Sequence, residues 1–210
     1  MLAMPAKAQT KPRFDIHPSV LMAQSIIAGM PEKTGRSLEE WVELVQTDGP
    51  PTEKERAAWL KAAHGLGTNY AGFIAQTSVG KGDEVTVEGY LQQAGQYVEN
   101  LFAGPKAALR PIYEALLAAG LKLGKDVRVC PCRTFVPLYR NHVFAQIKPA
   151  TRARIDLGLA LKDTRTPKRL VDTGGFAKKD RITRRIEIAS VAEIDDEVRR
   201  WMKAAYDMDA

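Results

Sequence analysis

The stretch Arg152-Ala-Arg-Ile-Asp-Leu-Gly-Leu-Ala-Leu161 decides how the second half of this 210-residue chain folds. Apolar residues occupy every second position in it, namely Ala153, Ile155, Leu157, Leu159 and Leu161. Because successive side chains of a β-strand point to opposite faces, this period of two predicts a strand with one buried face. The alternate positions, which lie on the opposite and open face, are Arg152, Arg154, Asp156 and Gly158.

Four more segments around this strand have strand character. They are residues 127–130, 134–140, 142–148 and 181–188. In the last segment the positions with the parity of buried residues are Ile182, Ile186 and Ile188, and Arg184 shares that parity. Asn141 separates two of the segments, which is typical of a tight hairpin turn. We therefore expect an antiparallel sheet.

Helical patterns flank the sheet on both sides. Residues 90–102 and 106–118 precede it with apolar residues at helical spacing. Behind it, Ser190 and Glu193 have the spacing of a capping box, which predicts the start of a helix. The apolar stripe of that closing helix is Ile194, Val198, Trp201 and Ala205. The expected fold class is α+β: an all-helical N-terminal domain, then an antiparallel sheet with two leading helices and one closing C-terminal helix.

The first half of the chain reads as helical from residue 18 to about residue 80. Two capping boxes begin helices there, Ser37 with Glu40 and Thr52 with Glu55. A polar stretch bounded by glycines then suggests a linker. The predicted organisation is a loose arm at 1–17, a small helical domain at 18–80, a linker at 81–89 and an α+β domain at 90–210.

Composition places the chain among ordinary globular proteins. Hydrophobic residues make up 45% and charged residues 27%, which is enough to bury a core. Two cysteines cannot build a disulfide framework, so a reducing compartment is expected. We find no apolar region typical of a secretory signal and no apolar run of about 18 residues. The sequence thus predicts a cytoplasmic protein without membrane contact.

Charge is distributed unevenly along the chain. Residues 122–185 contain seven Lys and ten Arg against five Asp and no Glu, a net charge of +12, whereas the whole chain carries +6. A basic block beside an acidic remainder indicates where an anionic partner would dock. Nucleic acid is one such partner.

The open face of the expected sheet gathers the candidate binding residues. They are Arg133, Tyr139, Lys148, Arg152, Arg154, Arg181 and Arg185. Cations interleaved with aromatic rings on an open sheet hold single-stranded nucleic acid, with phosphates on Arg and bases on rings. The alternative is a solvated face on which Asp156 and Glu187 form cross-strand ion pairs with the arginines.

A second candidate is the basic loop at 162–179. Its residues of interest are Lys168, Arg169, Gly174 and Gly175. A glycine pair beside cations can cradle a phosphate group. The alternative is a solvated loop, since no phosphate-loop or dinucleotide fingerprint is present.

The remaining motifs offer little chemistry. Cys130 and Cys132 are two residues apart and could supply two metal ligands or a redox pair, but zinc needs about four ligands, and buried structural thiols are the alternative. No paired carboxylates, Ser-His pair or cofactor motif accompanies them, so neither a cofactor nor a metal is predicted. The interpretation is a non-enzymatic binding protein for an anionic ligand. Two alternatives stay open: a small-molecule or metal-handling pocket between sheet and helices, and an interaction module whose acidic helical domain contacts a protein partner or packs on the basic domain.

Both halves resemble known domains. The segments at 34–45, 58–61 and 64–67 resemble a short helical bacterial domain of unknown function. The segments at 144–149, 154–159, 172–175 and 201–206 resemble an uncharacterised YdhG-like α+β domain, which is sometimes labelled a predicted transport protein. The resemblance implies a two-domain bacterial family, and it implies no catalytic residues.

Overall fold

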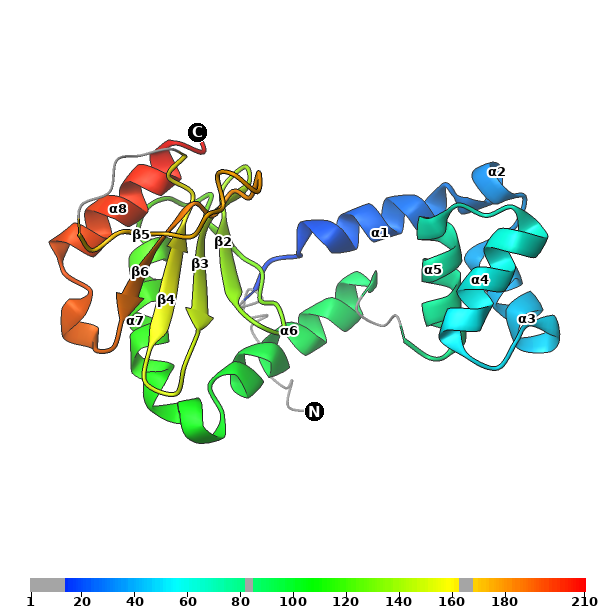
Figure 1. Cartoon of the computed structure of the whole chain (residues 1–210), viewed down its shortest axis with the longest axis horizontal. Coiled ribbons are helices and arrows are strands. Elements are labelled where there is room, and N and C mark those ends of the chain that lie inside the picture. The colour runs from blue at the N-terminus through cyan, green and yellow to red at the C-terminus, as the bar shows by residue number, and fades with distance from the viewer. Residues whose placement is uncertain (1–13, 82–84, 163–167) are drawn as a thin grey trace, which may run out of the picture. The chain divides into compact units, whose positions relative to one another are not determined.

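The computed structural model describes residues 14–81, 85–162 and 168–210. The chain divides into a helical unit, Ile16–Gln93, and a sheet unit, Ala94–Ala210, which also includes Phe14 and Asp15 (Figure 1). The division falls inside α6 (Val87–Leu101). Most of the predicted N-terminal arm and positions 82–84 of the predicted linker lie outside the described residues. The predicted domain limits stay a prediction.

Before α6, the described residues of the helical unit form five helices, several of which begin or end at strong local signals. They are α1 (Pro18–Ala28), α2 (Met30–Thr34), α3 (Leu38–Asp48), α4 (Glu53–His64) and α5 (Thr68–Ser78). Both predicted capping boxes are present: the Glu40 N–H donates to Ser37 Oγ, and the Ser37 N–H donates to Glu40 Oε2 at 2.7 Å. Thr52 and Glu55 repeat this exchange at the start of α4. The caps satisfy backbone groups that the first helical turn leaves unpaired.

The core of the helical unit lies between α3, α4 and α5. Met30, Val45, Leu60 and Ile74 are fully buried there. The indole N–H of Trp41 donates to Thr34 Oγ1 at 2.8 Å, so the polar atom of this buried ring is satisfied. The unit therefore holds its own hydrophobic core.

The sheet unit contains six antiparallel strands with helices before and after them (Figure 1). The leading elements are the part of α6 from Ala94 onward, the 3₁₀ helix η2 (Gly104–Leu109) and α7 (Arg110–Leu121), in the places of the two predicted leading helices. The strands are β1 (Arg128–Val129), β2 (Val136–Tyr139), β3 (Val143–Pro149), β4 (Ile155–Leu159), β5 (Val171–Asp172) and β6 (Arg184–Ile188), in the spatial order β1-β2-β3-β4-β6-β5. The short 3₁₀ helix η3 (Val191–Glu193) and α8 (Asp196–Asp207) close the chain. The predicted α+β fold class is confirmed.

One face of this sheet packs on helices. Ile155, Leu157 and Leu159 of β4 are fully buried, as the alternation predicts. Both α7 and α8 contact β3 on this face. A side chain at Gly120 of α7 would collide with Leu138 of β2, so glycine permits the close approach of helix and sheet. Every helix of the described ranges is too short or too polar to cross a bilayer.

Three local expectations are corrected. The last helix begins at Asp196, because Asp195 rather than Ser190 caps it and accepts from the Val198 N–H at 3.1 Å. The strand β5 lies within the segment that we expected to be a loop. Ile182 precedes β6, and its Cγ2 covers Gly158 on the open face, because the regular strand begins only at Arg184. Arg184 itself has the predicted inward parity and is buried.

Candidate anion-binding site

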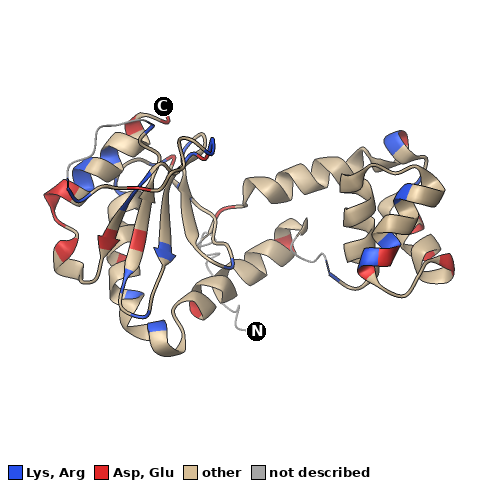
Figure 2. Ribbon diagram, viewed as in Figure 1, with Lys and Arg blue, Asp and Glu red and all other residues tan. Residues whose placement is uncertain are grey.

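The open face of the sheet carries charges of both signs. Cross-strand register places Lys148 opposite Asp156, and Asp156 opposite Glu187. Gly158 pairs with Arg185 one step further along the same strands. Figure 2 shows basic and acidic positions on the neighbouring strands β3, β4 and β6. The face is therefore not uniformly basic.

Two arginines of this face are held by two carboxylates. Arg185 donates to Asp156 Oδ2 at 2.6 Å and lies 3.0 Å from Glu187 Oε1. Arg154 lies 2.8 Å from Glu187 Oε2, and its Nε lies 2.9 Å from Asp156 Oδ1 in an ion pair that lacks hydrogen-bond alignment. These four groups form a closed, charge-neutral ring. Arg154 and Arg185 thus have the cross-strand ion pairs of the alternative interpretation.

Three other predicted residues meet at one end of the sheet. Arg133, Lys148 and Arg152 line an open hollow of about 550 Å³ together with Lys106 of η2. We call this the basic hollow. Lys106 donates to the carbonyl of Pro149 at 2.7 Å, which fixes its ammonium group at the turn between β3 and β4. No carboxylate occurs among the described residues that line it.

Lys106 could not be found by sequence reasoning. It lies outside the basic block, on an element that precedes the sheet by some twenty residues. No local motif connects it with Arg152, and only the folding of η2 against the turn after β3 brings them to one hollow.

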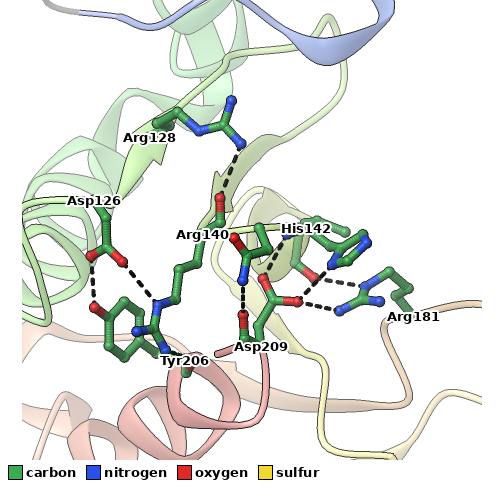
Figure 3. Close-up of polar contacts among 9 residues, drawn as sticks. Asp126, Arg128, Arg140, His142, Arg181, Tyr206 and Asp209 are labelled. Atoms are coloured by element: carbon green, nitrogen blue, oxygen red, sulfur yellow. Dashed lines mark hydrogen bonds and ion pairs between the residues drawn. The ribbon is translucent and has the colours of Figure 1, made fainter.

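Arg181 and Tyr139 lie elsewhere. Arg181 donates to Asp209 Oδ1 at 2.6 Å and to the carbonyl of Val143 (Figure 3). The guanidinium of Arg128 lies 5.8 Å from the centre of the Tyr139 ring, and burial raises the pKa of Tyr139 to about 12. Neither residue lines the basic hollow.

A polar network that sequence reasoning missed lies at the C-terminal end of α8, close to Arg181. Tyr206 donates to Asp126 Oδ1 at 2.7 Å, and Arg140 donates to Asp126 Oδ2 at 2.9 Å (Figure 3). The Tyr206 hydroxyl and then Arg140 hold the pKa of Asp126 below its ordinary value. Asp209 accepts from the His142 N–H at 2.7 Å. These contacts tie α8 to the β2–β3 hairpin, which is a structural role.

The described residues of the basic loop at 162–179 make structural contacts, and positions 163–167 lie outside the described residues. Arg169 donates to Asp195 Oδ2 at 2.6 Å and thereby holds the start of α8. The pKa of Asp195 is lowered first by the hydrogen bond from the Val198 N–H and then by Arg169. Gly174 has a φ of 69° and donates to Asp172 Oδ1, and Gly175 lies against the carbonyl of Ile182. Lys168 is exposed.

The two cysteines lie at the β1 side of the sheet unit, and neither forms a disulfide. Cys130 is buried and Cys132 is half-buried. Burial raises the pKa of Cys130 to about 12 and that of Cys132 to about 11. In the described ranges, no three His, Cys, Asp or Glu side chains lie together as metal ligands. The arrangement is that of protonated, structural thiols.

Both thiols are therefore expected to react slowly. At pH 8 a thiol with a pKa of 11 is only about 0.1% thiolate, whereas an ordinary cysteine is about one-quarter thiolate. Iodoacetamide should modify the native protein at least about 100-fold more slowly than the urea-unfolded protein. Mass spectrometry of timed samples measures both rates. Equal rates in the two states would contradict this assignment.

The fold is that of a two-domain α+β protein with a helical N-terminal unit. Residues 98–209, more than half of the chain, match the family model described as "Domain of unknown function (DUF5655)", and the chain belongs to that family. Residues 22–78 match the model described as "Domain of unknown function (DUF4287)". No curated protein and no solved structure matched the chain. The predicted two-domain uncharacterised family is confirmed, whereas the YdhG-like label stays a prediction.

Proposed function

We propose that the sheet unit binds single-stranded nucleic acid through its phosphate groups, with the basic hollow as the contact site. The observation that carries this proposal is the set of cations in one hollow: Lys106, Arg133, Lys148 and Arg152 line it without a carboxylate among the described lining residues. A cluster of one charge sign raises the local concentration of an oppositely charged ligand.

The surroundings of the hollow support phosphate rather than base recognition. Lys148 and Arg152 are exposed, and within the described ranges neither has a carboxylate at ion-pair distance. No aromatic side chain is among the described lining residues, so base stacking does not contribute there. Phosphate contacts carry no sequence information. The proposed binding is therefore independent of nucleotide sequence.

The test is fluorescence anisotropy of labelled single-stranded DNA and RNA at several salt concentrations. Four phosphate contacts on a single strand predict a slope of about −3 in a plot of log affinity against log salt. The double variant Lys148→Glu, Arg152→Glu should lose binding. The matched control is Lys122→Glu, Lys125→Glu, which makes the same charge change on exposed residues away from the hollow.

The outcomes separate three cases. Binding that the hollow variant loses and the control variant keeps supports the proposal. If both variants weaken nucleic-acid binding equally, the binding is a long-range charge effect and the basic hollow is not its site. No binding of wild-type protein even at low salt would end the proposal.

A further inference from the structure

A second hollow lies at the other end of the sheet unit. It has a volume of about 470 Å³ and lies where the end of β4, residues 176–183 and the end of α8 meet. It shares no lining residue with the basic hollow. Its size is within the range of small-molecule pockets, about 300–1,000 Å³. We call it the apolar hollow.

Four of its described lining residues are apolar, and two of these are small. Ala160 and Ala205 are buried and leave room because their side chains are short. Phe176 and Met208 stand at the hollow with 59% and 41% of their surfaces exposed. Large apolar groups left in water are unfavourable, and an apolar ligand would cover them.

Two lysines at the hollow have a strained backbone. Lys162 and Lys179 have φ values of 52° and 57°, and they are the non-glycine residues with positive φ in the described ranges. This left-handed conformation costs free energy for a residue with a Cβ, and such strain collects at binding sites. Both lysines line the apolar hollow. The unfavourable backbone conformations in the described ranges outside glycine thus occur at this hollow.

The charges of the hollow favour an anionic group. Lys162 and Lys179 have no carboxylate at ion-pair distance in the described part of the chain. Asp209 also lines the hollow, but it already accepts from Arg181 and His142 (Figure 3). The carboxylate of Asp180 accepts from the Ile182 N–H at 3.1 Å. Arg181 thus neutralises Asp209, whereas Asp180 keeps its charge, and the three cations against two carboxylates leave the described lining residues with a net charge of +1.

We propose that the apolar hollow binds a small organic acid with an apolar body. The alkyl or aryl body lies against Ala160, Ala205 and the exposed Phe176. The carboxylate lies between Lys162 and Lys179. This proposal does not rest on the proposed nucleic-acid function, and its test is separate.

The test is isothermal titration of the full chain with decanoate. Two comparison ligands have one half of the required chemistry each: acetate has the charge without the apolar body, and decyltrimethylammonium has the body with the opposite charge. We expect decanoate to bind and both comparison ligands to fail. Binding of decyltrimethylammonium as tight as that of decanoate would overturn the assigned head group.

One substitution tests the site without endangering the fold. Lys179→Gly removes the ammonium group, and glycine accepts the positive φ at this position. A charge-assisted hydrogen bond lost from a binding site weakens affinity by about tenfold or more. Lys178→Gly is the matched control, since Lys178 is exposed and does not line the hollow.

The expected pattern is weaker decanoate binding in Lys179→Gly and unchanged binding in Lys178→Gly. Phe176→Ala should also weaken decanoate binding, because it removes part of the apolar wall. If the wild-type protein does not bind decanoate, or if Lys179→Gly binds it as tightly as wild type, the proposal is wrong.

Discussion

Replacing Leu157 by Ala is expected to lower the free energy of unfolding of the sheet unit by about 2–5 kcal/mol. Leu157 is fully buried in β4. Its neighbours across the strands are Ile147 of β3 and Ile186 of β6, and both are fully buried as well. The shorter side chain leaves a cavity, and a central strand held on both sides has little freedom to collapse into it.

The two cysteines make this measurement specific to the sheet unit. They are the only ones in the chain, and both lie after β1. Thiol labelling at increasing urea therefore follows the unfolding of this unit without a signal from the helical unit. Leu121→Ala is the control, because Leu121 is exposed and surface changes stay within about 0.5 kcal/mol. A Leu157→Ala curve that coincides with this control would show that β4 is not central to the core.

Replacing Asp156 by Ala is expected to destabilise the sheet unit by about 1–3 kcal/mol. Asp156 is only 13% exposed and contacts both Arg154 and Arg185. Its loss leaves two guanidinium groups around Glu187, which is 39% exposed and better solvated. Breaking one partner of a fully buried pair costs about 3–5 kcal/mol, and the partial exposure of these arginines reduces that value.

A double-mutant cycle of Asp156 and Arg185 isolates their coupling. Residues in one ion-pair network show coupling energies of about 0.5–3 kcal/mol. Glu187→Ala should cost less than Asp156→Ala because its carboxylate is more exposed. Additive effects of Asp156→Ala and Arg185→Ala would mean that the ring contributes no cooperative stability.

The fold was predictable wherever one periodic pattern decided the outcome. The alternation of Ile155, Leu157 and Leu159 marks a strand, and Ser37 with Glu40 marks a helix start. The pattern misled at Ser190, because Asp195 is a competing cap nearer to the apolar stripe. It also missed β5, whose two residues are too few to show a period.

The candidate site was predictable only in part. Side-chain parity places Arg154 and Arg185 on the open face, but parity does not decide whether an arginine faces solvent or a carboxylate. The arginines face carboxylates because cross-strand register places Asp156 opposite Glu187, and the sequence of a single strand does not contain that register. Arg181 lies just before β6 begins, so strand parity does not apply to it, and Asp209 holds it.

The order of the strands bears on how fast the sheet unit folds. From β1 to β4 each strand pairs with its neighbour in the chain, so these contacts close short loops. β4 instead pairs with β6, and the chain between them includes β5, so the contact of Leu159 with Arg184 closes a longer loop. Closing a longer loop costs more chain entropy, and local contacts speed folding. We expect the β2–β3–β4 meander to form first, and β6 and α8 to join it in the later, slower part of the reaction.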